Sequence, residues 1–331
     1  MTENQHLISI IMPVRDTENY VGETLDSIVN QSFQNWELIA VNDNSSDNSL
    51  GVMLPYTSDK RIKIVSNPNP GLLNALRYGY SKASGTIIHR MDSDDLMPKN
   101  KLERMMEAWK IHGKGCVITG GVEYFIDQGE LGDGFMRYAK WLTDVSAQNT
   151  HAENIYRESV IASNCWLVHR EDFDRIGGFN PNTFPEDYDL CFRFYCGGIK
   201  IVGLDAILHK WRDRPDRISR NWAVYKDNRF FALKVNYFYI KDRERERPLV
   251  LWGGGKNGKD LAQLLLKKEA NFHWVCDNQN KIGKEIYGMR MHHYDSINSL
   301  HNPQIIIAVA GPNDQMTIAA SLKNKDYWFF Q

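Results

Sequence analysis

The sequence lacks the patterns that mark secreted, membrane-spanning or nucleic-acid-binding proteins. Its five cysteines include no C-x-x-C pair, which suits a reducing compartment better than a disulfide framework or a zinc site. No apolar segment reaches the roughly 18–20 residues that cross a bilayer, and the first residues do not resemble a signal peptide. The net charge of -1 provides no basic field for nucleic acid. These absences predict a cytoplasmic protein with no nucleic-acid partner.

Short apolar segments alternate with helix-like segments through the first third of the chain. The expected strands are 7–13, 36–43, 61–67 and 86–91. Such alternation predicts an α/β fold with a mainly parallel sheet. Ligands collect at the carboxyl ends of the strands in these sheets, and the polar stretches VNDNSSD and RMDSDD stand at two of those ends.

The strand–helix pattern restarts after Pro248 with the segment LVLWGGG. The charged stretch KDRERERP at 241–248 predicts a linker, which divides the chain into a domain over 1–240 and a small α/β domain over 249–331. An aromatic-rich helix is expected over 219–239. Its aromatic side chains either pack the two domains together or lie on a lipid surface beside the membrane.

Three aspartates stand within four positions after the strand 86–91. In extended chain Asp92 and Asp94 point to one side, and two converging carboxylates suit Mg²⁺ or Mn²⁺. A calcium loop would need a glycine where the chain has Met97. We expect Asp95 to cap the next helix, with Pro98 in its first turn. D-x-D alone is a weak motif, so a polar loop that only caps a helix stays an alternative.

Four segments in order carry a more specific signal. They are ISIIMPVRD, WELIAVNDNSSDNS, NPNPGLLNALRYGYSKASGTIIHRMDSDD and FPEDYDLCFRF, which together lie within 7–212. As a set they resemble the family 2 glycosyltransferases, inverting enzymes with a GT-A fold that use nucleotide sugars. The resemblance implies a nucleotide-sugar donor, a saccharide acceptor and a Mn²⁺ or Mg²⁺ ion. Arg15-Asp16 in place of Tyr-Asn, and Arg77 in place of asparagine, leave the donor open.

The resemblance also implies roles for single residues on the donor side. Asp43 would accept a hydrogen bond from a base such as uracil or thymine, Asp94 would ligate the metal, and Asp92 would contact ribose or metal. Further predicted contacts to the nucleotide sugar or metal are Pro13, Val14, Arg15, Asp16, Arg90, Ser93 and His209. Arg90 would pair with a phosphate or hold Asp92. Structural roles remain open: Asp43 as a turn former, Arg90 as an ion-pair partner and His209 as a buried histidine.

Sugar transfer needs a carboxylate that takes the proton of the acceptor hydroxyl. The stretch FPEDYDL resembles the family's acidic pair at a helix start, which implies Asp187 as the base and Glu186 as an orienting group. Carboxylates in a first helical turn are also ordinary stabilisers of a helix. The arginines of WRDRPDRISR would either clamp an anion or form a solvated face.

The small domain carries G-x-G-x-x-G as Gly253, Gly255 and Gly258, and Asp277 ends the next strand. This is the phosphate loop of dinucleotide-binding folds in its usual context, although the domain is long enough for only about half of such a fold. The segment resembles the Rossmann-like unit of bacterial sugar acyltransferases, which binds a nucleotide sugar. A second nucleotide site is one interpretation, and a structural or homodimerising role is the other.

The sequence as a whole predicts a metal-dependent inverting glycosyltransferase of bacterial surface-polysaccharide assembly. Its acceptor would be a saccharide, either free or lipid-linked, and the enzyme would work in the cytoplasm or at the inner face of the cell membrane. The alternative is an NAD(P)-dependent oxidoreductase or a nucleotide-sugar-binding module centred on the glycine loop.

Overall fold

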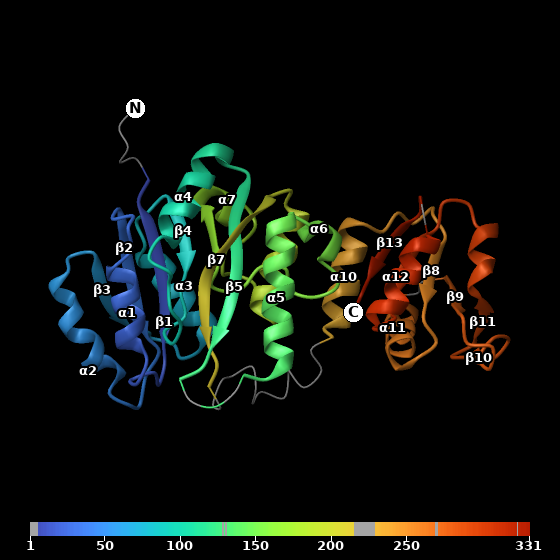
Figure 1. Cartoon of the computed structure of the whole chain (residues 1–331), viewed down its shortest axis with the longest axis horizontal. Coiled ribbons are helices and arrows are strands. Elements are labelled where there is room, and N and C mark those ends of the chain that lie inside the picture. Colours follow the sequence, from blue (N-terminus) through green and yellow to red (C-terminus); the bar gives the residue numbers. More distant parts are fainter. Residues whose placement is uncertain (1–5, 128, 130, 215–228, 269–270, 323) are drawn as a thin grey trace. The chain divides into compact units, whose positions relative to one another are not determined.

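The chain forms two compact units in a computed structural model that describes residues 6–127, 129, 131–214, 229–268, 271–322 and 324–331 (Figure 1). The first unit takes Met1–Ala152 and Val160–Arg220, and the second takes Glu153–Ser159 and Asn221–Gln331. The second unit therefore begins well before the expected boundary at 240. It also includes a short segment that the sequence alone assigned to the first domain.

The first unit is built on a seven-stranded sheet in the order β3-β2-β1-β4-β6-β5-β7. The strands are β1 (Ile8–Val14), β2 (Trp36–Asn42), β3 (Ile62–Ser66), β4 (Ile87–Arg90), β5 (Cys116–Phe125), β6 (Trp166–His169) and β7 (Lys200–Arg212). All neighbouring pairs are parallel except those that β6 makes with β4 and β5. The expected α/β fold with a mainly parallel sheet is confirmed.

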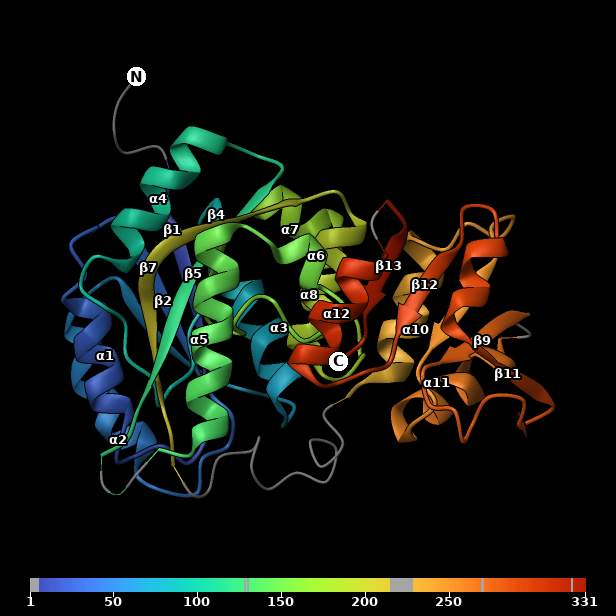
Figure 2. The same ribbon diagram turned by 45° about the vertical axis from the view of Figure 1, so that its right-hand side comes forward.

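Helices cover both faces of this sheet because its central strands are apolar on both sides. The helices are α1 (Val21–Val29), α2 (Ser49–Met53), α3 (Leu72–Lys82), α4 (Lys101–His112), α5 (Asp133–Gln148), α6 (His151–Asn154), α7 (Arg170–Arg175) and α8 (Glu186–Cys196). Side chains of α1 and α4 share a core with Ile10, while α3 packs against Ile39 and Val41. Gly79 permits the close approach of α3, because a Cβ there would lie 2.8 Å from a methyl group of Val41. Helix α5 lies along β5 and β7 (Figure 2).

The topology brings the predicted site together at one edge of the sheet. The strands β1, β2 and β4 run parallel, so the loops after them share the carboxyl edge. The long strand β7 reaches the same edge, where Lys210 exchanges two backbone hydrogen bonds of 3.0 and 3.1 Å with Leu96. The loop after β4 is therefore held by β7, a strand more than 100 residues further along the chain.

The second unit has its own sheet in the order β10-β11-β9-β8-β12-β13. Its strands are β8 (Leu249–Trp252), β9 (Phe272–Cys276), β10 (Glu285–Ile286), β11 (Met289–His293), β12 (Gln304–Ile307) and β13 (Asp326–Phe329), and all are parallel except β10. Its helices include α10 (Phe231–Lys241), α11 (Lys256–Lys267) and α12 (Pro312–Ser321). The strand order reverses between β8 and β12, as it does in doubly wound folds. The six strands make a larger sheet than the half of such a fold that the length of the domain predicts.

The charged segment 241–248 packs onto the second unit instead of forming a free linker. Arg243 and the backbone of Glu244 both donate to the Gln304 side-chain oxygen at 2.9 Å, and Arg247 pairs with Asp326 at 2.7 Å. The charges of this segment find partners on the strands β12 and β13. The sequence shows the charges but not the partners, which is why the segment resembles a linker.

The described part of the aromatic helix also belongs to the second unit. Phe231, Tyr237 and Phe238 of α10 are buried, and the Phe238 ring lies 5.1 Å from the Trp328 ring. The Phe238 ring also lies 6.0 Å from the Tyr156 ring and 6.1 Å from the Phe330 ring, so it packs within the second unit. Trp222 and Tyr225 lie outside the described residues, and contact with a lipid surface stays a prediction. No helix in the described ranges has both the length and the apolar character needed to cross a bilayer.

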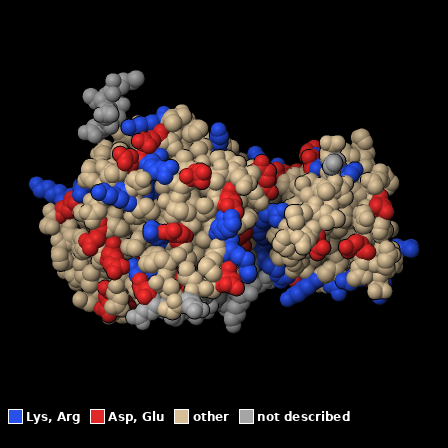
Figure 3. Space-filling model, viewed as in Figure 1, with Lys and Arg blue, Asp and Glu red and all other residues tan. Residues whose placement is uncertain are grey.

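Acidic and basic side chains are interspersed on the face seen in Figure 3.

Candidate active site

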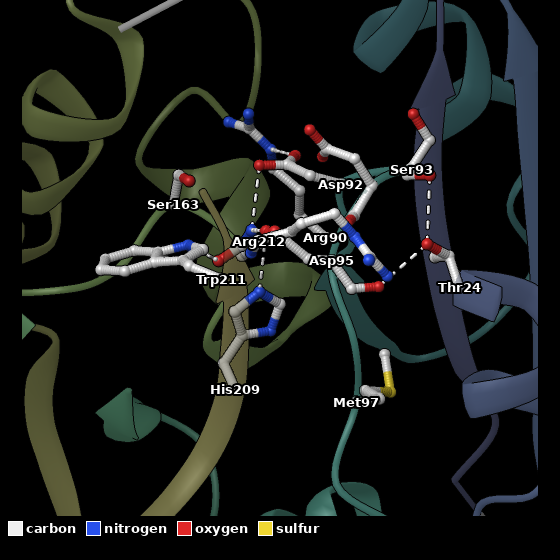
Figure 4. Close-up of polar contacts among 12 residues, drawn as sticks. Thr24, Arg90, Asp92, Ser93, Asp95, Met97, Ser163, His209, Trp211 and Arg212 are labelled. Carbon is white, nitrogen blue, oxygen red and sulfur yellow. Dashed lines mark hydrogen bonds and ion pairs between the residues drawn. The ribbon is translucent and has the colours of Figure 1, made fainter. Parts of the chain in front are cut away.

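Asp95 anchors the aspartate loop, residues 92–95, to β7. Its carboxylate is 1% exposed and accepts hydrogen bonds from the backbone N–H of Arg212 at 2.8 Å and from His209 Nε2 at 3.0 Å (Figure 4). The expectation that Asp95 caps a helix is wrong, because α4 begins at Lys101 and Pro98 precedes it. A buried carboxylate needs donors, and those of β7 satisfy it.

Asp92 and Asp94 lie on the same loop, each beside a nitrogen donor. Asp92 accepts from Arg90 Nε at 3.0 Å and from Asn164 Nδ2 at 2.9 Å, and Asp94 accepts from Arg214 Nε at 3.0 Å. Their side chains are 24% and 15% exposed. The guanidinium groups therefore offset the repulsion between these carboxylates. Both carboxylates are set at the carboxyl edge of the sheet where a ligand would approach.

His209 lies inside the protein, below these carboxylates. Its side chain has no exposure, Nε2 contacts Asp95, and Nδ1 lies 3.0 Å from Lys101 Nζ. Burial lowers the pKa of Lys101 to about 8, although nearby anionic groups oppose that shift. With both ring nitrogens engaged, the geometry favours a structural role for His209 over metal ligation. The sequence did not single out Lys101 as part of this network.

The carboxylates of Asp92 and Asp94 are therefore the groups on this loop that could hold a metal ion. Within the described residues no three histidine, cysteine, aspartate or glutamate side chains form a metal-binding cluster. Mg²⁺ and Mn²⁺ are nevertheless often held by one or two carboxylates together with substrate phosphates and water. The oxygen donors of Asp92 and Asp94 fit that type of site. Ser93 faces inward, where its hydroxyl accepts a hydrogen bond from Thr17 at 3.1 Å.

Arg90 connects the aspartate loop to the acidic pair. Its guanidinium is buried and donates to Asp92 through Nε and to Glu186 through Nη1 at 3.1 Å. Burial alone would lower the pKa of Arg90, but the carboxylates of Asp92, Glu186 and Asp187 raise it above its usual value. The side chain is thus a permanent cation between two groups of carboxylates. The predicted pairing of Arg90 with Asp92 is present, and the contact with Glu186 adds to it.

Asp187 lines a pocket beside this arginine. The pocket is walled by apolar side chains that include Leu73, Phe179 and Leu190, and both Glu186 and Asp187 belong to its lining. Asp187 is half-buried in the first turn of α8, and Oδ1 accepts the N–H of Tyr188 at 2.8 Å. A carboxylate at the wall of a pocket is placed to receive a proton from a bound hydroxyl group.

Asp43 follows β2 and is buried among hydrogen-bond donors. Its Oδ1 accepts from Asn67 Nδ2 at 2.7 Å and from the N–H of Gly71 at 2.9 Å, and Oδ2 lies 3.8 Å from an Arg15 nitrogen. Asp43 therefore fixes the start of α3.

Four further residues were predicted to contact the nucleotide sugar. Pro13 and Val14 are buried in β1, and Arg15 is exposed. Asp16 accepts a hydrogen bond from the N–H of Ser46 at 2.7 Å.

Two further arginines hold backbone carbonyl groups, Arg77 before the acidic pair and Arg212 on the loop that carries Asp92. Arg77 of α3 donates to the carbonyl oxygens of Phe179 and Asn180, both at 2.8 Å, so it clamps the chain that leads to the acidic pair. Arg212 is buried and donates to the carbonyl oxygen of Asp94 at 2.9 Å. Of the predicted arginine cluster, Arg217 and Arg220 lie outside the described residues.

The glycine loop of the second unit lies after β8, at the point where the strand order reverses. A Cβ at Gly258 would lie 1.8 Å from the carbonyl oxygen of Gly253, so glycine is required there. A Cβ at Gly255 would meet no atom within 4 Å. Lys281 donates to the carbonyl oxygen of Gly254 at 2.8 Å, and Asp277 follows β9. The second nucleotide site stays a prediction.

Comparisons with known proteins show the family of this chain. Residues 9–177 match the family model described as glycosyl transferase family 2. The chain is 29% identical over 226 residues to the glycosyltransferase GlyA of Streptococcus pneumoniae, covering 65% of this chain and 32% of GlyA. It is 26% identical over 254 residues to TuaG of Bacillus subtilis, whose name assigns it to teichuronic acid biosynthesis, covering 73% of this chain and 96% of TuaG. The chain thus spans only about a third of GlyA.

Solved structures share the fold at low sequence identity. Residues 1–349 of Staphylococcus aureus TarS in complex with UDP-GlcNAc superpose with a TM-score of 0.55 at 17% identity, covering 78% of this chain and 71% of that TarS fragment. The mannosyltransferase PcManGT of Pyrobaculum calidifontis, in complex with GDP-Man and Mn²⁺, gives 0.52 at 16% identity, covering 70% and 63%.

Proposed function

This chain belongs to glycosyl transferase family 2 and has a GT-A fold, and from that premise we propose that it moves a sugar from a UDP-sugar to a saccharide hydroxyl with inversion. One observation carries the proposal. Arg90 joins Asp92 of the aspartate loop to Glu186 of the acidic pair, so the carboxylates of the donor side and of the acceptor side surround one guanidinium. Such an arrangement suits a reaction between two substrates that meet at this point.

The surroundings of Asp43 support a uracil or thymine base in the sugar donor. Its carboxylate accepts from two groups, the Asn67 amide and the N–H of Gly71, whose hydrogen bond is shared between Oδ1 at 2.9 Å and Oδ2 at 3.1 Å. A carboxylate oxygen accepts about two hydrogen bonds, so Oδ2 has capacity for one further donor. Uracil and thymine present a single N–H at the pairing edge, whereas guanine presents two adjacent donors. The remaining position on Oδ2 therefore favours uracil or thymine over guanine.

Asp94 and Asp92 would hold a Mn²⁺ or Mg²⁺ ion, which when bound offsets the negative charge that grows on the departing diphosphate. The protein's own part is to keep both carboxylates ionised and oriented. Arg90 and Arg214 do so through the ion pairs of 3.0 Å described above. A cation beside a carboxylate favours its charged form.

Asp187 would take the proton of the acceptor hydroxyl as that oxygen attacks the anomeric carbon. The nucleoside diphosphate leaves from the opposite face of the sugar, so one displacement inverts the configuration. Glu186 is restrained by Arg90, and we assign it the role of orienting the acceptor or the base. The proton ends on Asp187 and the bonding electrons leave with the diphosphate.

The acceptor class follows from the relatives and not from the pocket. TuaG is named for teichuronic acid biosynthesis, and its alignment covers most of both chains. We propose a role in bacterial surface-polysaccharide assembly, with an acceptor that is a free or a lipid-linked saccharide.

A nucleotide panel tests the proposal without knowledge of the acceptor. The unfolding temperature of the full chain is measured with UDP, GDP, dTDP, NAD or NADP, each with and without Mn²⁺. A ligand at a hundred times its dissociation constant stabilises by about 2.7 kcal/mol, so binding is readily detected. We expect UDP with Mn²⁺ to give the largest rise. A response to GDP but not UDP would contradict the base assignment, and a response to NAD alone would favour an oxidoreductase.

A further inference from the structure

Asn164 lies at the centre of the hydrogen bonds around the aspartate loop. It comes from the segment that precedes β6, carries no recognised motif and is completely buried. Its Nδ2 donates to Asp92 Oδ2 at 2.9 Å and to Asp95 Oδ2 at 2.6 Å. One amide group therefore bridges two of the three aspartates.

The orientation of this amide is fixed by Trp211 on β7. The indole N–H of Trp211, shown in Figure 4, lies 3.0 Å from Asn164 Oδ1. An indole nitrogen is only a donor, so the Asn164 oxygen must face it. The NH₂ group is then directed at the aspartates. Two ionised carboxylates can accept from that group but would repel the oxygen.

The consequence for Asp92 is that each of its oxygens has a separate donor. Arg90 holds Oδ1 and Asn164 holds Oδ2, and the two contacts together fix the plane of the carboxylate. The second donor is neutral, so it orients Asp92 without adding another positive charge beside the metal position. The same amide ties Asp92 to Asp95 and through it to β7. The side-chain orientation of Asp92 is thus coupled to the strand.

We infer that Asn164 is a positioning residue that sets the Asp92 carboxylate for the metal and the donor diphosphate. The inference rests on the proposed function, because it assigns Asp92 to that site. Partners that orient a ligating side chain typically change metal affinity or activity by about 10- to 100-fold when they are removed. Asn164 meets the requirements for such a partner, being buried, fully hydrogen-bonded and locked in one orientation.

The test compares two asparagine variants that both lose contacts to β7. Asn164→Ala removes the amide that holds Asp92. Asn149→Gly removes a side chain that bonds Gly203 of β7 at 2.7 and 3.2 Å but touches no aspartate. Glycine suits position 149, where φ is 54°. The affinity of the full chain for UDP is measured by calorimetry with and without Mn²⁺, alongside the unfolding temperature.

We expect Asn164→Ala to weaken Mn²⁺-dependent UDP binding by about 10- to 100-fold, with metal-free UDP binding and the Asn149→Gly variant nearly unchanged. Trp211→Phe removes the orienting N–H together with part of the ring and keeps the Asn164 amide, so it should shift the same affinity in the same direction by less, which keeps the test valid if Asn164→Ala does not fold. If UDP affinity fell equally with and without Mn²⁺, or if Asn164→Ala and Trp211→Phe both kept the wild-type affinity, the inference about Asn164 would be overturned while the proposed function would stand. Failure of the wild type to bind UDP more tightly with Mn²⁺ would overturn the proposed function as well.

Discussion

Both units carry loops at the carboxyl ends of parallel strands, but the two loops differ in chemistry. Each unit has a mainly parallel sheet with its first strand, β1 or β8, inside the sheet. In the first unit the carboxyl ends of the strands carry carboxylates paired with arginines, as in Asp92 with Arg90. In the second unit the loop after β8 carries glycines, of which Gly253 and Gly254 are buried and Gly255 is exposed. The first arrangement suits a metal with a diphosphate, and the second suits a phosphate on backbone N–H groups. Topology thus places a site, and side chains decide its ligand.

The largest effect is expected from Asp94→Asn. The substitution removes the charge that we assign to the metal while keeping the shape of the side chain, so turnover and Mn²⁺-enhanced UDP binding should both be lost. Release of UDP from a UDP-sugar measures turnover, and calorimetry measures binding. If Mn²⁺ still enhanced UDP affinity in this variant, Asp94 would not be the ligand and the contrast between the two loops would weaken.

A smaller loss is expected from Asp187→Asn. An amide cannot take the acceptor proton, so kcat should fall by about 10²- to 10⁴-fold, whereas donor binding should stay close to that of the wild type. Steady-state kinetics on the accepted donor and acceptor pair measures the split between kcat and KM. Weaker donor binding at unchanged kcat would move Asp187 from proton transfer to substrate binding.

The amino edge of the first sheet offers a test of stability. Glu37 is buried on β2, where burial would raise its pKa, but Lys63 and hydroxyl and N–H donors lower it to about 2. Because the pKa of Glu37 is lower in the folded state than its unfolded value of 4.5, the ionised side chain adds to the free energy of unfolding at pH values above 4.5. This contribution is at most about 3 kcal/mol, and it is lost as the pH falls toward 2. Urea unfolding of wild type and Glu37→Gln should therefore differ most at pH 7 and converge as the pH falls from about 5 toward 2. A constant difference across this range would show that Glu37 acts by packing.

The smallest and sharpest test concerns the second unit. Gly255→Val should leave the fold intact, because a side chain there points into open space. If phosphates rest on this loop, the variant should lose a second, Mn²⁺-independent nucleotide-binding event while the site of the first unit still binds UDP. Calorimetry on the full chain with UDP, UDP-GlcNAc, NAD and NADP measures both events. A single binding event in the wild type would favour a structural role for the second unit.

The sequence predicts the parts of the site that lie on consecutive residues. Short apolar runs predict β1, β2 and β4, and the polar residues after them mark the edge where Asp43 and Asp92 lie. The contacts that fix those residues come from far along the chain. Asn164 and Asp92 are 72 residues apart, and His209 and Asp95 are 114 apart. No local pattern reports such pairings, so the role of Asp95 was wrongly predicted and Asn164 was not identified.

The segment Glu153–Ser159 has a consequence for how this chain can be divided. It lies in the sequence of the first unit but packs in the second, where Lys234 donates to the carbonyl oxygen of Arg157 at 2.8 Å and Tyr156 donates to Asp242 at 2.5 Å. A gene fusion or truncation made at one point between the units would separate this segment from its partners. The second unit is therefore not a cassette that recombination can add or remove in one step.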